Sequence, residues 1–351
     1  MISLDHYDYH LPDELIAKHP ASPRDSARLF VYNTKTDKIS FDVFRHLNQH
    51  LPHPSLLVFN DTKVVPARLW LRKETGGKIE VLLMMNEYRS GDTTIRGITD
   101  RKILPGVKLY FARGAYLEAI KQEEQFFFFQ PSVSMSAFWT LLEQEGKTPI
   151  PPYIKQSKLS EHILRKKYQS VLAKHPASIA APTASLHFTD RLLKKIEQHD
   201  IKHANVTLHV GAGTFAPIDG SHIREKKLFT EYYNITRKSA NAINGAKASG
   251  VPIIPVGTTA MRTLESSAAH TKEHCVEEEE LPTNIFIYPP YEFLIADGLI
   301  TNFHVPRSSL ILLVDALLIH KNARRNILEL YDIAIKERFR FYSFGDGMLI
   351  I

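Results

Sequence analysis

The sequence predicts an α/β fold: a discontinuous, layered α/β domain at residues 1–65 and 150–351, with a small antiparallel β-barrel domain inserted at 66–149. Two observations predict it. Short strand-like segments fill the middle of the chain, whereas strands alternate with helices after it. A buried strand at 55–59 precedes the barrel, so the barrel interrupts the α/β domain. The length of 351 residues suits two domains of about 150 residues each.

The inserted unit is predicted from its strand spacing. About six short strands, roughly 8–12 residues apart, are typical of a small antiparallel barrel or sandwich. Turn residues, among them Gly76, Gly91, Gly106 and Gly114, separate several of them. Four phenylalanines at 126–129 are read as a buried strand. A proline-rich segment at 148–152 closes the unit. The expected strands are 67–73, 78–88, 93–99, 107–112, 115–122 and 124–130.

The second half of the chain alternates strands and helices, which predicts a sheet with much parallel pairing. Gly250 lies just past the end of one helix, and Gly257 precedes the start of another. The expected strands are 204–210 and 251–256, and the expected helices are 237–247, 258–269, 308–319 and 322–338.

Composition places the chain among ordinary globular proteins, with 44% hydrophobic and 23% charged residues. The net charge of +6 is compatible with a polyanionic partner but does not require one. The single cysteine, Cys275, excludes an internal disulfide and favours a reducing compartment. The N-terminal residues lack the apolar segment of a signal peptide, and the longest apolar run, 310–319, contains Asp315 and is too short to span a membrane. We therefore expect a cytoplasmic monomer with no membrane partner.

Common catalytic motifs are absent. The chain has no phosphate-binding GxxxxGK[ST] loop, no HExxH zinc motif and no GxSxG nucleophile elbow. Gly211 and Gly213 follow a predicted strand but lack the third glycine of a dinucleotide-binding fingerprint.

Polar stretches nonetheless follow several predicted strands. Those at Asn60, His209 and Thr258 lie where a strand ends, and ligands of α/β sheets bind at the carboxyl ends of strands. These three stretches therefore favour one shared pocket. Further polar stretches lie at 180–189, 301–306 and 344–347.

Each polar stretch also has a purely structural interpretation. Asp61 suits a turn, and His187 suits a helix entry. Thr258 and Thr259 suit a helix cap, although the same helix start could bind a carboxylate. On that helix Arg262 and Glu265 have the spacing of an ion pair. A zinc site made by His187, His209 and His304 lacks any local ligand spacing and is disfavoured, so we expect no metal.

Basic residues concentrate at 155–174. This segment contains six lysines and arginines and one glutamate, a local charge of 6 − 1 = +5. Tyrosines are interleaved with them, a combination that suits RNA phosphates and stacked bases. A solvated helix face explains the charge equally well. The residues expected to contact RNA are Lys155, Lys158, Arg165, Lys166, Lys167 and Tyr168.

Taken together, the blocks of the chain resemble one family, the S-adenosylmethionine:tRNA ribosyltransferase-isomerases of queuosine biosynthesis. The resemblance covers nearly the whole chain and includes YDYHLP at 7–12, PRD at 23–25, LVFNDTKVVPARL at 57–69, GGKIEV at 76–81, AAPT at 180–183, LHVGAGTF at 208–215, GTTAMRTLES at 257–266, IFIYP at 285–289, LITNFH at 299–304 and FGDGMLI at 344–350.

The resemblance implies an enzyme that transfers and isomerises the ribosyl part of S-adenosylmethionine onto 7-aminomethyl-7-deazaguanine at the tRNA wobble position. The product is epoxyqueuosine, adenine and methionine are released, and no cofactor is needed beyond the consumed S-adenosylmethionine. The chemistry requires a base and an acid of suitable pKa. The candidates are Asp61, His187, His209, Glu231 and His304. Candidate substrate-binding residues are Arg24, Thr183, Gly211, Gly213, Thr258, Thr259, Arg262, Glu265, Asn302 and Asp346.

The chain departs from the family pattern at 226–231. Members usually carry His-x-Met-His-x-Glu there, whereas this chain has Lys226 and Phe229 in place of the histidines and keeps Glu231. A glycine is also expected at Ser185 and at Pro290. The departures leave an alternative open: a divergent homologue that binds tRNA or a nucleoside without this catalysis.

Overall fold

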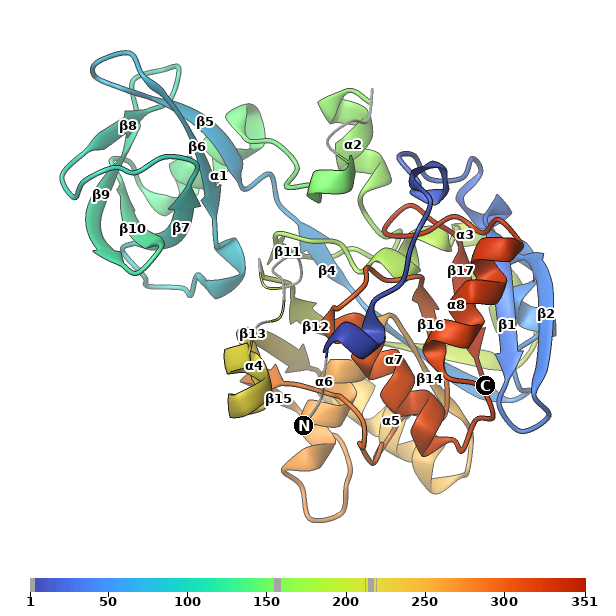
Figure 1. Cartoon of the computed structure of the whole chain (residues 1–351). Coiled ribbons are helices and arrows are strands. Elements are labelled where there is room, and N and C mark those ends of the chain that lie inside the picture. Colours follow the sequence, from blue (N-terminus) through green and yellow to red (C-terminus); the bar gives the residue numbers. More distant parts are fainter. Residues whose placement is uncertain (1–3, 155–158, 212, 214–217, 219) are drawn as a thin grey trace.

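The α/β part of the molecule is built on one mixed sheet (Figure 1). The computed structural model describes residues 4–154, 159–211, 213, 218 and 220–351. Within these residues the sheet has nine strands, in the order β15 (Glu279–Ile285), β13 (Lys227–Ile235), β12 (Ile201–His209), β3 (Ser55–Asn60), β14 (Ile253–Val256), β16 (Leu299–Asn302), β17 (Gly347–Ile350), β1 (Arg28–Asn33) and β2 (Lys38–Val43). The four central strands, β12, β3, β14 and β16, are parallel neighbours, so their carboxyl ends meet at one edge.

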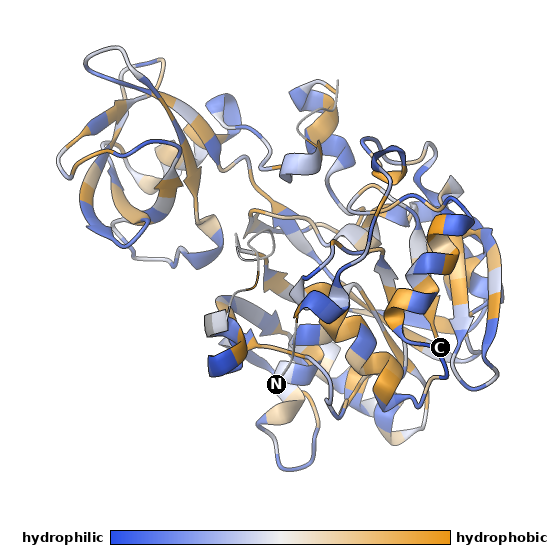
Figure 2. Cartoon of the chain, in the orientation of Figure 1, coloured by the Kyte–Doolittle hydropathy of each residue, from blue (hydrophilic) through white to orange (hydrophobic). Residues whose placement is uncertain are grey.

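Helices cover both faces of this sheet. Leu57 and Phe59 of β3 pack with α3 (Asp190–Glu197), whereas Leu56 and Val58 pack with α5 (Arg237–Ala248) and α6 (Thr258–Ala269). This alternation follows from the two-residue period of a strand. A third cluster joins the sheet to α7 (Ser309–His320) and α8 (Ile327–Lys336), and α7 is apolar around most of its surface (Figure 2).

Helix α8 begins later than predicted, and the sequence expectation of 322–338 was wrong at both ends. Asn326 accepts a hydrogen bond from the backbone of Glu329, and the Glu329 side chain accepts one from Asn326, a reciprocal capping box. The cap fixes the first turn at Ile327. Helix α6, in contrast, has the predicted bounds.

The barrel confirms the predicted antiparallel architecture. Six strands close it in the order β10 (Phe126–Pro131), β7 (Ile95–Thr99), β6 (Lys78–Leu83), β5 (Arg68–Lys73), β8 (Lys108–Tyr110) and β9 (Tyr116–Glu123). All of them lie within the expected insert, and α1 (Met135–Glu145) packs on their core. The division into two folding units stays a prediction.

The four phenylalanines of β10 are only half buried, which corrects the sequence interpretation. Phe127 and Phe129 enter the barrel core, while Phe126 and Phe128 face outwards under Arg96 and Lys121. Figure 2 shows the same alternation of apolar and polar residues along the barrel strands.

Short elements link these parts. The remaining strands are β4 (Thr62–Val64) and β11 (His175–Ser178). The remaining helices are α2 (Glu161–Lys167) and the six-residue α4 (Gly220–Glu225). The 3-10 helices are η1 (Leu4–Tyr7), η2 (Asp13–Leu15), η3 (Arg24–Ser26), η4 (Phe44–Gln49), η5 (Met85–Glu87), η6 (Pro152–Ile154) and η7 (Thr183–His187). Strands β4 and β11 pair in parallel beside the main sheet. Among the described residues, no helix has the length and apolarity to cross a membrane.

Candidate functional site

The predicted strand ends do come together, and Asn60 joins them. At the end of β3, its Oδ1 accepts hydrogen bonds from the backbone N–H groups of Thr62 (3.1 Å) and Leu208 (3.0 Å). Its Nδ2 donates to the Leu208 carbonyl and to Thr259 Oγ1, both at 3.0 Å. One buried amide thus ties the ends of β3 and β12 to the start of α6.

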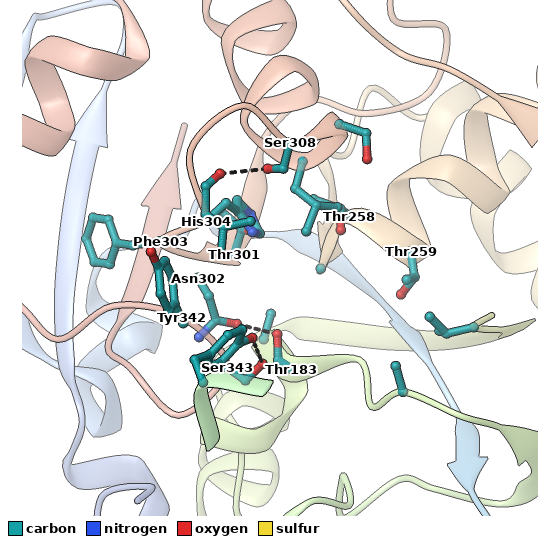
Figure 3. A pocket seen from close by; sticks show the side chains of 18 of the residues that line it. Thr183, Thr258, Thr259, Thr301, Asn302, Phe303, His304, Ser308, Tyr342 and Ser343 are labelled. Atoms are coloured by element: carbon teal, nitrogen blue, oxygen red, sulfur yellow. Dashed lines mark hydrogen bonds between the residues drawn. The ribbon is translucent and has the colours of Figure 1, made fainter. Parts of the chain in front are cut away.

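A cavity of about 710 Å³ opens at the carboxyl ends of β14 and β16 (Figure 3). Its polar wall is mostly uncharged and comes from six segments of the chain. The hydroxyl, amide and imidazole groups on that wall belong to Tyr153, Tyr168, Thr183, Thr258, Thr259, Thr301, Asn302, His304, Ser308, Ser309, Tyr342 and Ser343. Asp5 and Arg307, which lie 3.6 Å apart as an ion pair, are the charged groups at its lining.

Asn302 organises one side of this cavity. Its Oδ1 accepts from Thr183 Oγ1 at 2.9 Å, and its Nδ2 lies 3.1 Å from His187 Nε2. Because an amide NH₂ only donates, His187 Nε2 is the acceptor, and the proton of the neutral ring is on Nδ1. Burial lowers the pKa of His187 to about 4. The ring is therefore neutral at pH 7.

His304 is held in the cavity wall by a second hydroxyl. Its Nε2 lies 2.8 Å from Thr301 Oγ1, and its backbone N–H donates to the Tyr331 hydroxyl at 2.9 Å. Burial lowers the pKa of His304 to about 3. The cavity therefore presents a neutral imidazole at physiological pH.

Helix α6 starts at the same cavity. Gly257 is the N-cap residue, with φ = 95°, a conformation that favours glycine, and it has no side chain to cap the first turn. Thr258 and Thr259 line the cavity instead of capping their own helix, so the capping interpretation was wrong. The first N–H groups of the helix carry a partial positive charge that suits an anion.

His209 and Asp61 lie next to the shared edge but do not line the cavity. His209 Nδ1 is 2.8 Å from Thr62 Oγ1, and burial, with Arg89 nearby, lowers the pKa of His209 to about 4. Asp61 Oδ1 accepts from Thr207 Oγ1 at 2.6 Å. Burial raises the pKa of the Asp61 carboxyl, against the effect of that hydrogen bond.

Glu231 pairs with Arg262, not with a histidine. Glu231 Oε2 accepts from Arg262 Nη1 and its Oε1 accepts from the Gly211 N–H at 2.8 Å, with both side chains buried. Nε and Nη2 of Arg262 have no hydrogen-bond partner in the described part of the chain. The expected Arg262–Glu265 pair is wrong, because a strand 31 residues away supplies the carboxylate.

Three proposed substrate contacts are occupied by the protein itself. Both Glu265 oxygens accept from backbone N–H groups at 294–296, and burial raises the pKa of Glu265. Asp346 accepts from Arg340 and from the Arg28 N–H. Arg24 donates to the carbonyls of residues 166 and 169. None of the three is among the residues that line the cavity, and their role as substrate contacts stays a prediction.

The basic segment is only partly available to RNA. Lys155 and Lys158 lie outside the described residues, whereas Lys166 is exposed and Lys167 half-buried at the end of α2. Arg165 is engaged by Glu161, Glu143 and the Gly146 carbonyl. Tyr168 is 1% exposed and lines the cavity, so its expected role in stacking on bases is wrong.

Packing accounts for the two glycines after β12. A Cβ on Gly213 would lie 2.5 Å from the Phe229 ring, and one on Gly211 would lie 2.8 Å from Asn86 Nδ2. Sequence reasoning missed Asn86, and it missed Tyr342 and Ser343 of the cavity wall, because no motif marks them. No group of three or more His, Cys, Asp or Glu residues suited to a metal occurs in the described ranges.

Comparisons with known proteins agree with this architecture. A family model described as "Queuosine biosynthesis protein" matches residues 4–350. The S-adenosylmethionine:tRNA ribosyltransferase-isomerase of Carboxydothermus hydrogenoformans is 41% identical over 351 residues, all of both chains. The protein of the same name from Aquifex aeolicus is 41% identical over 348 residues, 99% of both chains.

A solved structure shares the fold. The crystal structure of S-adenosylmethionine tRNA ribosyltransferase from Thermotoga maritima superposes with a TM-score of 0.54 at 31% identity. The match covers 98% of this chain and 99% of that one. With a family model, full-length relatives and a solved fold in agreement, the chain belongs to the queuosine biosynthesis protein family.

Proposed function

We propose that this chain is an enzyme that transfers and isomerises the ribosyl part of S-adenosylmethionine onto 7-aminomethyl-7-deazaguanine at the wobble position of tRNA. The product is epoxyqueuosine, and adenine and methionine are released. The observation that carries the proposal is the cavity of about 710 Å³ at the strand ends, a size usual for small-molecule sites. Relatives that match the chain end to end carry the enzyme's name, and none of them favours a homologue that only binds.

The polarity of the cavity suits S-adenosylmethionine. The sulfonium is a cation, and a protonated imidazole beside it would repel it. The lowered pKa values of His187 and His304 keep both rings neutral, which removes that repulsion. The start of α6, with Thr258 and Thr259, is the anion-binding end of the cavity and would hold the methionine carboxylate.

The reaction needs a proton acceptor near the ribose. A base removes the acidic proton on the ribose carbon beside the sulfonium, and adenine leaves. The deprotonated amine of the modified base attacks the ribose, and an alkoxide closes the epoxide as methionine departs. Of the five proposed catalytic residues, His304 is the one that lines the cavity, so we assign it as the base. Burial lowers its pKa to about 3, which leaves the ring unprotonated at physiological pH but also makes it a weak base.

The other four proposed catalytic residues are assigned as positioning residues. His187 orients Asn302, and His209 orients Thr62. Asp61 holds Thr207, and Glu231 holds both the Gly211 backbone and Arg262. They fix the strand ends around the cavity without lining it.

The test is incubation with S-adenosylmethionine and tRNA carrying 7-aminomethyl-7-deazaguanine, followed by mass spectrometry of the nucleosides. We expect a ribosyl adduct together with free adenine. The matched control is the same tRNA with guanine at the wobble position, which lacks the attacking amine. No adduct, under conditions where the Aquifex aeolicus relative makes one, would overturn the proposal.

We also propose that the enzyme is a cytoplasmic monomer that needs no metal or cofactor. The reducing compartment indicated by the single Cys275 and the use of tRNA as a substrate support this location. Light scattering at micromolar concentration tests the monomer, and activity retained after dialysis against EDTA tests the independence from metal.

A further inference from the structure

A second cavity of about 890 Å³ lies between the barrel and strand β13. We call it the barrel groove. Its barrel side and its sheet side both carry aromatic rings, and a buried amide lines it between them. The residues that define it here are Asn86, Arg96, Phe126, Gly211, Phe229 and Tyr232.

Cations stack on aromatic rings on both sides of the barrel groove. The Arg96 guanidinium carbon lies 3.6 Å from the centre of the Phe126 ring, and that of Arg89 lies 3.5 Å from the centre of Tyr232. Phe229 is 40% exposed, so part of its ring is accessible to a ligand. Aromatic rings and guanidinium planes are the surfaces on which unpaired nucleobases stack, whereas the Arg96 charge is paired at 3.0 Å with Glu87 of the same groove.

A buried polar atom of the barrel groove lacks a partner in the part of the chain that the structure describes. Asn86 is 1% exposed, and within the described residues its Oδ1 has no hydrogen-bond partner. Nη2 of Arg89, which is not itself a lining residue but stacks on Tyr232 of the groove wall, has none in these residues either. An unpaired buried acceptor is unfavourable and rare in folded proteins. A ligand that brings an N–H donor to Asn86 would satisfy it, and asparagine amides are common readers of base edges.

We propose that the barrel groove binds one unpaired purine of an RNA loop, a base that carries N–H donors on its edge. The inference rests on the proposed function, and the base is then the wobble base of tRNA. Its aromatic walls stack on the base, and Asn86 Oδ1 accepts from the exocyclic amine on the base edge.

The barrel groove and the cavity at the strand ends have one lining residue in common. Pro152 lines both. Gly211, which lines the barrel groove, donates its N–H to Glu231, and Glu231 binds Arg262 of the helix that begins at the cavity. A base held in the barrel groove therefore lies next to the donor substrate.

The test measures the dissociation constant of a fluorescent anticodon stem-loop RNA in the absence of S-adenosylmethionine. Phe229→Ala removes one stacking surface, and we expect it to raise the Kd about 5- to 100-fold. The matched control is Phe41→Ala, because Phe41 has the same 40% exposure but lies on β2, outside the barrel groove. Equal Kd values for Phe229→Ala and the unaltered chain would overturn the proposal, as would equal losses in both variants.

A second measurement concerns Asn86. In the unaltered chain, inosine in place of guanine at the wobble position removes an N–H₂ donor, and we expect a Kd about 5- to 100-fold higher. In Asn86→Leu the two RNAs should bind alike, with thermal melting as the check on folding. If the unaltered chain binds guanine and inosine loops equally, the role of Asn86 is refuted without any variant.

These binding results are separable from the proposed function. Groove-dependent RNA binding with no ribosyl adduct would refute the enzyme and retain the groove. An adduct formed with unchanged KM for tRNA in Phe229→Ala would retain the enzyme and refute the groove.

Discussion

The cavity at the strand ends and the barrel groove differ in the chemistry of their walls. The cavity is lined by hydroxyls, an amide and a neutral histidine, with one ion pair at Asp5 and Arg307. The barrel groove is lined by aromatic rings with guanidinium groups stacked on them. A neutral wall suits a small cation, whereas arginine and aromatic side chains suit a nucleic acid. The two walls thus suit substrates of opposite charge, the S-adenosylmethionine cation and the tRNA polyanion, and Pro152 lines both.

Breaking the buried ion pair between the two regions should have the largest effect. Arg262→Met leaves the Glu231 carboxylate buried without its partner, and we expect a loss of about 3–5 kcal/mol in the free energy of unfolding. Urea denaturation measures it. The double variant Arg262→Met/Glu231→Leu removes the orphaned charge and should recover most of the loss. A single variant as stable as the original chain would show that the pair does not hold the two regions together.

The histidines beside the strand ends should make stability depend on pH. Burial lowers the pKa of His187 and His209 to about 4 and that of His304 to about 3, so the unfolded chain binds more protons below pH 6.5. Their contribution is fully present above pH 6.5 and is lost as the pH falls towards 4. From pH 7.5 to 5.5 the loss is about 4 kcal/mol for the three together.

Urea midpoints at the two pH values check this dependence. His187→Gln should show a smaller pH effect, while His162→Gln, at an exposed position on α2, should keep the original one. An identical pH dependence in the two variants would contradict the assignment to buried histidines.

Removing the amide that organises the cavity should have an intermediate effect. Asn302→Leu leaves Thr183 and His187 without their partner, and we expect a loss of about 1–3 kcal/mol and weaker binding of S-adenosylmethionine. Isothermal titration measures the binding. Asn241→Leu, on the exposed surface of α5, is the control. We expect Asn302→Leu to leave the Kd for RNA unchanged. A higher Kd for RNA would show that the cavity and the barrel groove do not bind their ligands independently.

Removing the Tyr168 hydroxyl should affect the cavity at the strand ends but not RNA binding. Tyr168 lines the cavity, and within the described residues its buried hydroxyl has no hydrogen-bond partner, so Tyr168→Phe should change stability by less than about 0.5 kcal/mol. We expect a KM for S-adenosylmethionine raised a few-fold and an unchanged Kd for tRNA. A higher Kd for tRNA in Tyr168→Phe would show that Tyr168 contributes to RNA binding after all.

The smallest effect is expected at the lysines of α2. Lys166→Gln and Lys167→Gln should each reduce the slope of log Kd for tRNA against log salt by about 1, with no change in stability. Lys272→Gln, at an exposed position far along the chain, should leave the slope unchanged. If the salt dependence of the Kd for tRNA has the same slope in all variants, the lysines of α2 do not bind RNA phosphates and serve solubility instead.

Much of the fold was predictable because local patterns were strong. The bounds of α6 follow from an apolar strand, Gly257 and a helical run, and all three signals lie within a few residues of one another. The barrel strands follow from their alternation and turns. Helix α8 was placed too early because an apolar helical pattern does not reveal where Asn326 caps it.

The candidate site was predictable in place but not in detail. The strand ends at Asn60, His209 and Thr258 could be identified because parallel strands finish at one edge. The function of individual residues could not. Tyr168 lies in a basic segment, which suggested RNA contact, yet its ring turns inwards to the cavity.

The sequence by itself determined the family, the order of strands and helices, the barrel and the edge where ligands would bind, since each depends on motifs or on neighbours along the chain. Only the tertiary structure decided that Arg262 pairs with Glu231 and that Asn86 faces a groove between barrel and sheet. The physical reason is that these partners come from elements that are distant along the chain. The order of strands in the sheet decides which distant residues become neighbours, and local sequence patterns do not specify that order.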